Sequence, residues 1–265
     1  MTLREITLKA REIPKLGLEA DCITPDNFEG KKLEKLKKLG VFIGNTTDNL
    51  ENYFDISERE VNGEGGIRIV IEGDVSRVKR IGERMTDGEI IIRGDVGVHL
   101  GNEMEGGRIK VNGNVDSYVG TLIKGGRIII EGNAGNFVGC SHRGDWRGMR
   151  DGEIIIKGNV GSNIGECMRG GLIRIGGNAN QFVGIRMNGG TIIVNGNTSG
   201  RLGAEMKNGM IIVNGIVEEM LPSFVERSEK RDIKINNETM KGRFIEYVGD
   251  LAEAGKGLIY VRKNG

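Results

Sequence analysis

The chain has 265 residues, and its 38 basic and 37 acidic side chains give a formal net charge of +1. This balance creates no bulk attraction to nucleic acid or to an acidic membrane surface. No apolar run approaches the roughly 18 residues needed to cross a bilayer, and no apolar signal region follows the charged N-terminus. We therefore expect a cytoplasmic protein that has neither nucleic acid nor a membrane as its partner.

The glycine and cysteine content further restricts the class of protein. Glycine makes up 45 of the 265 residues, more than twice its usual share of about 7%, which calls for a repetitive explanation. Cys22, Cys140 and Cys167 are widely spaced and form no CxxC pair. This spacing argues against a disulfide framework and against a metal or iron–sulfur site evident from sequence.

Residues 1–62 differ in composition from the repetitive middle of the chain and are expected to form an N-terminal capping segment. Ile6 and Leu8 alternate with polar residues, as in a strand. The charged stretch NFEGKKLEKLKKL at 27–39 predicts a helix, for which Asp26 or Asn27 would be the N-cap.

Residues 63–216 carry an internal repeat marked by eight glycines. These glycines are separated by 21, 19, 19, 26, 19, 19 and 19 residues: Gly73, Gly94, Gly113, Gly132, Gly158, Gly177, Gly196 and Gly215. Isoleucine stands four residues before each of them, and Ile or Val two before, so each unit contains one strand. A 19-residue unit cannot bury its own apolar face. The repeat therefore predicts a single-stranded parallel β-helix of about eight coils.

The polar residues that come after these glycines predict structural turns between coils. After Gly73 and Gly94 come Asp74 and Asp95; the column then continues as Asn114, Asn133, Asn159, Asn178 and Asn197. Glycine permits corners with positive φ, and Asn tolerates the left-handed region while bonding to neighbouring coils. The two aspartates alone resemble a carboxylate pair for polysaccharide cleavage, but a polar corner ladder explains the whole column better.

One unit contains an insertion, in the stretch GCSHRGDWRGM at 139–149, where Met149 arrives seven residues late. Cys140 and His142 suggest nucleophilic or metal chemistry, but they lack both the ligand count of a metal site and a third group to orient them. A local lid is another reading. We interpret the insertion as a docking loop, because it carries residue types common at interface hot spots. These candidate residues are Arg143, Asp145, Trp146 and Arg147.

A second candidate surface lies three residues before each repeat glycine, where side chains should point outward from the coil. Six of its eight members are apolar: Val70, Ile91, Lys110, Ile129, Ile155, Arg174, Ile193 and Ile212. An exposed apolar patch of this size normally marks an interface. Either a flank of the chain or another chain is expected to cover it, and Ile91, Ile129, Ile155 and Ile193 are the candidate contact residues.

Residues 217–265 are expected to form a C-terminal capping and docking segment, since the Asn column stops at Gly215-Ile216. Their last part, FIEYVGDLAEAGKGLIYV, is interpreted as a short helix followed by a strand. Open ends of a β-helix expose unpaired backbone, so both flanks have a reason to cover them.

Several motifs resemble one protein family across nearly the whole chain. They are LEADCITPDNFEGKKLEKL, LENYFDI at 50–56, the GG-x-I-x-I-x-G-[ND]-[VA] units, GCSHRGDWRGM and YVGDLAEAGKGLIYV. Together they resemble the C subunit of formylmethanofuran dehydrogenase, the tungsten- or molybdenum-dependent complex of methanogenic archaea. The position expected to be aromatic before RGDWRG is His142, which departs from the family pattern.

The resemblance implies a right-handed β-helix that braces the catalytic subunits and has no catalytic residue, cofactor or metal of its own. In such a complex a pterin-metal subunit, which holds tungsto- or molybdopterin, reduces carbon dioxide to formate. An amidohydrolase-like subunit with a binuclear metal centre condenses formate with methanofuran, and iron–sulfur subunits deliver electrons.

Three other classes remain as alternatives. The repeat units are shared with the β-helix domain of the glutamate synthase large subunit, so a stand-alone domain assisting an amidotransferase is the first. A polysaccharide-acting β-helix enzyme is the second, against which the Asn column argues. A left-handed β-helix acyltransferase would show 18-residue coils built from hexapeptides, unlike the 19-residue period found here.

Overall fold

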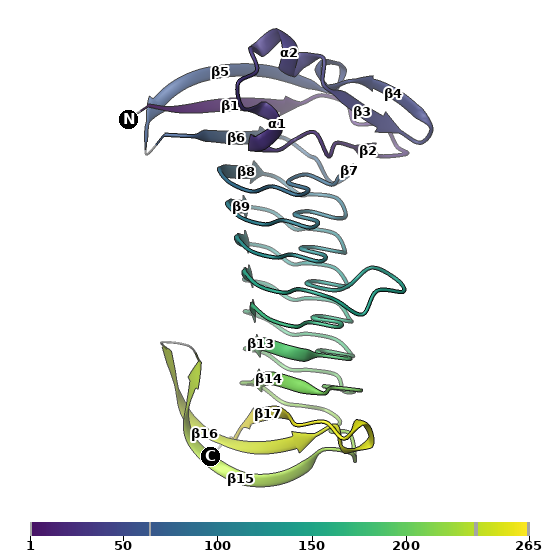
Figure 1. Cartoon of the computed structure of the whole chain (residues 1–265), viewed down its shortest axis with the longest axis vertical. Helices are drawn as coiled ribbons and strands as arrows, with labels where there is room; N and C mark the ends of the chain where they lie inside the picture. Colours follow the sequence, from purple (N-terminus) through teal and green to yellow (C-terminus); the bar gives the residue numbers. More distant parts are fainter. Residues whose placement is uncertain (1, 64, 236–237, 264–265) are drawn as a thin grey trace.

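The computed structural model describes residues 2–63, 65–235 and 238–263, and strands dominate it (Figure 1). The strands are β1 (Thr2–Ala10), β2 (Leu18–Glu19), β3 (Gly40–Ile43), β4 (Thr46–Asn49), β5 (Phe54–Asn62), β6 (Ile67–Glu72), β7 (Val78–Lys79), β8 (Glu89–Arg93), β9 (Arg108–Val111), β10 (Arg127–Ile130), β11 (Glu153–Ile156), β12 (Leu172–Ile175), β13 (Asn188–Val194), β14 (Asn208–Val213), β15 (Val225–Ile235), β16 (Glu238–Gly249) and β17 (Gly257–Arg262). The helical turns are α1 (Pro25–Phe28), α2 (Leu33–Lys37), η1 (Leu50–Asn52) and η2 (Leu251–Glu253). The prediction of an all-β chain is confirmed.

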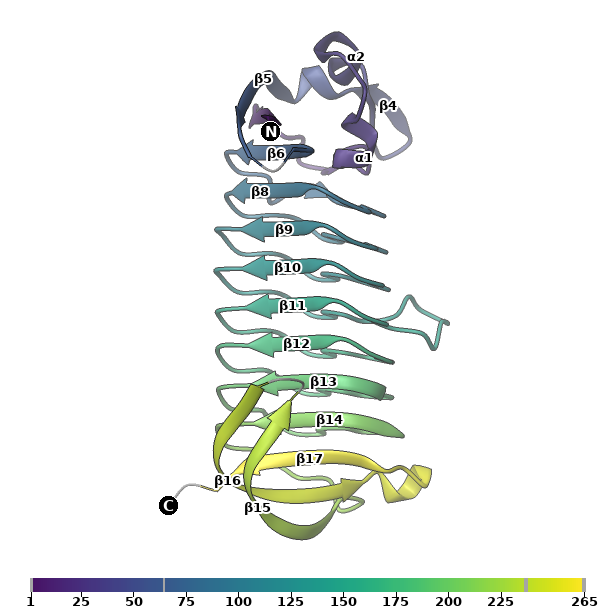
Figure 2. The ribbon, with the colours of Figure 1, turned by 60° about the vertical axis from the view of Figure 1, so that its left-hand side comes forward.

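Each repeat unit contributes one strand to a stack of parallel strands (Figures 1 and 2). The 13-stranded sheet has the order β15-β16-β17-β14-β13-β12-β11-β10-β9-β8-β6-β1-β5. Pairing follows the repeat register, with Ile128 opposite Ile154 and Ile154 opposite Ile173. A second column of parallel bridges runs from Val75 to Val217. The units therefore stack in register even across the insertion.

The core lies inside this stack and is built from like positions of successive units. The isoleucines four residues before the repeat glycines, such as Ile90, Ile109 and Ile128, are fully buried. Met104 and Met168, which close their units, are fully buried as well. Complete burial of one such side chain stabilises the fold by about 1.5–3 kcal/mol, and each unit buries its side chains only against its neighbours.

The polar column forms a hydrogen-bonded ladder along one corner. From Asp95 onward, the side-chain oxygen of each member accepts from the backbone N–H one unit further on, as Asn133 Oδ1 does from Asn159 N at 2.8 Å and Asn159 Oδ1 from Asn178 N at 2.8 Å, whereas Asp74 accepts from Ser76 N at 2.9 Å. The ladder begins at Asp95, whose carboxylate accepts from Asn114 N at 2.7 Å. Amides and a carboxylate are thus used as inter-unit acceptors.

The reason for glycine in the marked column differs from the expected one. Gly73 has φ of 97°, but Gly94 and the later glycines of the column lie outside the left-handed region. A Cβ at Gly94 would instead lie 2.3 Å from the Gly73 carbonyl oxygen of the preceding unit. The column therefore requires glycine because neighbouring backbones approach closely.

The N-terminal flank contains two short helices where one was predicted. Thr24 is the N-cap of α1, accepting from Asn27 N through Oγ1 at 3.1 Å, so the prediction of Asp26 or Asn27 as cap was wrong. Gly30 has φ of 65° and separates α1 from α2. Strand β1 lies between β5 and β6 and joins this flank to the main sheet, while β4-β3-β2-β7 form a second, small sheet.

The C-terminal flank also differs from expectation. Phe244–Gly249 belongs to strand β16, where no strand was predicted, and the predicted short helix is only the one-turn 3₁₀ helix η2. The strand predicted after it is confirmed as β17. Strand β17 pairs in parallel with β14 and extends the stack beyond Gly215. Both flanks share the main sheet with the repeat units, and the division into 1–62, 63–216 and 217–265 stays a prediction.

The hairpin of β15 and β16 bends back over the outer face of the last strands (Figure 2). At the bend Asp232 has φ of 56°, and its carboxylate accepts from Gly242 N at 2.9 Å. Beyond the bend, the hairpin's Ile233 and Ile235 form a second apolar cluster with Ile193 and Ile212. The chain thereby covers part of its own outer face.

Candidate docking site

The insertion forms a loop, residues 141–147, after which the repeat resumes. Met149 N donates to Gly139 O at 3.1 Å, and Gly148 N donates to Cys167 O at 2.8 Å, which restores the corner of the unit. Asp145 N donates to His142 O at 3.0 Å and closes a turn within the loop. The loop thus projects from two fixed ends.

Asp145 and Arg147 hold the outer part of the loop together. The Arg147 guanidinium donates through Nε to Asp145 Oδ1 at 2.9 Å and through Nη2 to Oδ2 at 3.0 Å. These two hydrogen bonds are the main reason that the pKa of the Asp145 carboxyl lies below its usual value. Asp145 also accepts from Arg147 N at 3.0 Å. The pair therefore acts within the loop and fixes the backbone on either side of Trp146.

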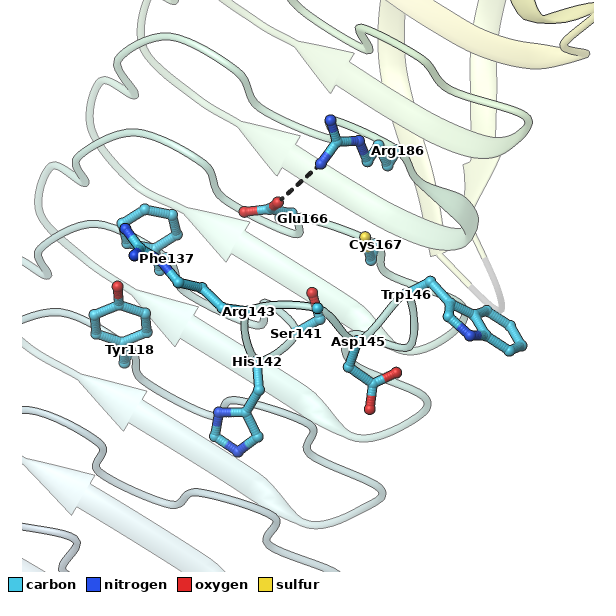
Figure 3. A pocket seen from close by; sticks show the side chains of 11 residues that line it. Tyr118, Phe137, Ser141, His142, Arg143, Asp145, Trp146, Glu166, Cys167 and Arg186 are labelled. Carbon is cyan, nitrogen blue, oxygen red and sulfur yellow. Dashed lines mark ion pairs between the residues drawn. The ribbon is translucent and has the colours of Figure 1, made fainter.

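Trp146 is the chain's single tryptophan and is 62% exposed. Its ring lies 4.0 Å from the Arg169 guanidinium carbon and 5.7 Å from that of Arg147. Figure 3 shows the indole pointing away from the side chains of His142, Arg143 and Asp145. Cation–π contacts with two arginines keep this apolar ring ordered while it faces solvent.

A cavity of about 350 Å³ lies between the loop and the turns of the neighbouring units (Figure 3). Its lining residues are Tyr118, Phe137, Ser141, His142, Arg143, Gly144, Asp145, Trp146, Glu166, Cys167 and Arg186. The Arg186 guanidinium forms an ion pair with Glu166, another lining residue, at 3.7 Å. It forms a second ion pair, at 2.9 Å, with Glu205, which lies outside the cavity. Arg143, Asp145 and Trp146 thus all line this cavity, and their role as interface residues stays a prediction.

An aromatic stack that sequence reasoning missed contributes Tyr118 and Phe137 to the wall of this cavity. His99 and Tyr118 have ring centroids 4.9 Å apart, and Tyr118 and Phe137 have theirs 4.8 Å apart. Burial, followed by the positive charge of Arg80, lowers the pKa of His99. The three residues are spaced by 19 in the sequence, a signal that could have found them. Arg169 was also missed, and nothing in its spacing indicates contact with Trp146.

Cys140 lies beneath the loop and is fully buried. Burial raises the pKa of its thiol to about 12, and its Sγ lies 3.5 Å from Thr121 Oγ1. A thiol with this pKa is protonated at neutral pH and is a poor nucleophile or metal ligand. Cys140 therefore behaves as a core residue of its unit.

The outer apolar column lies elsewhere, on the face of the parallel sheet. Ile91, Ile129 and Ile155 are half-buried there, between the two flanks. Ile193 is only 2% exposed because the β15–β16 hairpin covers it. Of the two covers expected for this face, the chain's own flank is the one found at Ile193. In Figure 1 the loop projects on the side away from the strands of the sheet, and the two candidate surfaces do not meet.

In residues 2–63, 65–235 and 238–263, no group of three or more His, Cys, Asp or Glu side chains is placed to hold a metal ion. Within the same part of the chain, no helix is long and apolar enough to cross a bilayer.

Known proteins give close matches. No protein-family model matches the chain. It is 60% identical over 259 residues to the C subunit of tungsten-containing formylmethanofuran dehydrogenase 2 from Methanothermobacter thermautotrophicus, covering 97% of this chain and 96% of that protein. It is 58% identical, with the same coverage, to the protein of that description from Methanothermobacter marburgensis.

A solved structure is similar as well. The crystal structure of the formyltransferase/hydrolase complex (FhcABCD) from Methylorubrum extorquens, in complex with methylofuran, contains a chain that superposes with a TM-score of 0.84 at 29% sequence identity. The match covers 97% of this chain and 100% of that one.

Proposed function

Because the chain belongs to the family of formylmethanofuran dehydrogenase C subunits, we propose that it is the non-catalytic brace of such a complex. The reaction served is the reduction of carbon dioxide and its condensation with methanofuran to formylmethanofuran, the first step of methanogenesis from carbon dioxide. The observation that carries the proposal is 60% identity over 97% of the chain.

The proposal assigns the chemistry to other subunits. A pterin-metal subunit with tungsten or molybdenum, an amidohydrolase-like subunit with a binuclear metal centre, and iron–sulfur subunits would surround this chain. The buried, protonated thiol of Cys140 supports a structural role for the insertion. The superposed chain belongs to a complex named for formyl transfer and hydrolysis, whereas the relatives belong to complexes named as dehydrogenases. A polypeptide shared by differently named activities is expected to support them rather than perform them.

The proposal also includes the β-helix itself. In-register parallel pairing of successive units, one strand per unit, supports a single-stranded parallel β-helix, and right-handedness is part of the proposal. Such a stack is stiff because every unit is bonded to the next through the sheet and through the Asn ladder. Stiffness is the property that a brace between two catalytic subunits requires.

Two surfaces are proposed to contact the other subunits. The first is the outer apolar surface formed by Ile91, Ile129 and Ile155, which the chain's own flanks leave half-exposed. The second is the docking loop, residues 141–147, with its exposed Trp146. Exposed apolar groups rimmed by charge are typical of protein interfaces.

The test is a native, anaerobic pull-down of the tagged full chain from its own cells, followed by mass spectrometry and metal analysis. We expect stoichiometric recovery with a pterin-metal and an amidohydrolase-like subunit. After the chain is separated from the complex, we expect no tungsten, molybdenum or iron to stay with it. Recovery of a lone monomer would overturn the proposal.

A further inference from the structure

Arg169 offers an unused set of hydrogen-bond donors at the exposed edge of the docking loop. Its guanidinium stacks on Trp146 at 4.0 Å and is exposed. Stacking occupies the flat face of a guanidinium and leaves its in-plane N–H groups free. None of the ion pairs among the described residues involves Arg169, although its neighbour Arg186 pairs with both Glu166 and Glu205.

The surroundings of Trp146 add to this local excess of positive charge. A second hollow, on the Arg169 side of the indole, is lined by Arg169, Arg186 and Lys207 and by Glu205 and Glu253. Glu205 is already paired with Arg186 at 2.9 Å. In the described part of the chain neither Arg169 nor Lys207 takes part in an ion pair, so the hollow presents more free cations than free carboxylates.

Two groups together define the chemistry of a fitting ligand. A guanidinium with free in-plane donors binds a carboxylate through two parallel hydrogen bonds. Covering an indole that is 62% exposed with an apolar surface of the partner adds binding free energy. A small free anion does not supply such a surface. A protein segment that carries Asp or Glu beside apolar side chains supplies both.

We propose that Trp146 and Arg169 form the anchor for an acidic segment of a neighbouring subunit. The inference rests on the proposed function, since it presupposes a complex, and it names the chemistry of the partner at the docking loop. The Asp145–Arg147 pair holds the loop backbone on both sides of the indole, so the anchor is preorganised before the partner arrives.

The test compares variants within the whole complex. The tagged chain carries Trp146→Ala, Arg169→Ala or Lys124→Ala, and its exchange out of the purified complex against untagged chain is followed over time. Lys124 occupies the position of Arg169 two units earlier and pairs with Glu105 instead, so it is the matched control. Trp146→Ala and Arg169→Ala should each raise the dissociation rate at least about 30-fold, equivalent to ~2 kcal/mol.

Lys124→Ala should leave the rate within about 3-fold of the unmodified chain, because Lys124 pairs with Glu105 of this same chain and its replacement removes no contact to another subunit. If both anchor variants also stay in that range, the anchor does not exist, and the bracing role stands because the complex is still recovered. If the unmodified chain is recovered alone, the proposed function fails first and the anchor fails with it.

A second measurement identifies the partner group directly. The Arg169→Lys variant places a primary amine at the anchor, and a carbodiimide joins that amine to an adjacent carboxylate as an amide. Mass spectrometry should find the link to an Asp or Glu of another subunit. A link to Glu205 or Glu253 of this chain alone, or no link at all, would show that no acidic segment sits there.

Discussion

The side-chain oxygen of Asn133 accepts a hydrogen bond from the backbone N–H of Asn159 at 2.8 Å, although 26 residues and the docking loop separate the two in sequence. The same bond joins Asn159 to Asn178 across an ordinary 19-residue spacing. The insertion is therefore accommodated outside the Asn ladder, and the corner that carries the ladder keeps its register. The stack therefore carries a projecting loop while the hydrogen bonds of its repeat are kept.

Asn159→Ala should lower the free energy of unfolding by about 1 kcal/mol, because it removes the acceptor of the Asn178 backbone N–H. Lys157→Ala, an exposed change in the same unit, should have little effect. Urea denaturation followed by circular dichroism measures both. Equal unfolding midpoints for the two variants would mean that water replaces the ladder bond at no cost.

Gly94→Ala should destabilise the chain by about 1–3 kcal/mol, since the new Cβ would lie 2.3 Å from the Gly73 carbonyl oxygen and would force two units apart. Gly40→Ala is the matched control, because its Cβ would meet only Thr47 Cγ2 at an ordinary 3.6 Å. Thermal unfolding of both variants checks the prediction. A Gly94 variant as stable as the control would leave the close backbone approach without consequence.

Ile129→Asp and Ile193→Asp should have different effects, one on assembly and the other on stability. Ile193 is 2% exposed beneath the hairpin, so a carboxylate there should reduce the stability of the chain by about 3 kcal/mol or more. Ile129 is half-buried, and its replacement should leave the fold intact but reduce recovery of the other subunits. Urea midpoints and co-purification yields separate the two effects.

Val225→Asp provides the control for that comparison, because Val225 is 49% exposed and lies on the hairpin, outside the outer apolar surface. It should change neither stability nor recovery. Unchanged recovery with Ile129→Asp would remove the outer apolar surface from the proposed contacts.

Cys140 should be unreactive toward thiol reagents at pH 8, because burial raises its pKa to about 12. Because the thiol has a higher pKa in the folded chain, its contribution to folding stability is complete below the pKa of the unfolded chain, which is near 9. This contribution is lost as the pH rises toward 12. Stability of the unmodified chain should therefore fall more steeply between pH 9 and 12 than that of Cys140→Ala. Denaturation at pH 8, 10 and 11 measures the difference, and rapid labelling of the folded chain at pH 8 would contradict the burial.

The sequence by itself determined the repeat, the strand in each unit, the alternating Ile and Val positions of that strand, and the Asn column. These features are local, because each unit contacts only the units before and after it, so one period of spacing encodes them all. The sequence also singled out the loop residues Arg143, Asp145, Trp146 and Arg147 as unusual within the repeat.

Only the tertiary structure decided what covers the outer face and what the loop touches. The bend at Asp232 and Gly242 lays the hairpin over Ile193, and the fold brings Arg169 under Trp146. Neither contact follows the 19-residue period, since each joins a nonrepeating segment to the stack. Even the role of Gly94 was hidden, because the distance between neighbouring backbones exists only after the units have stacked.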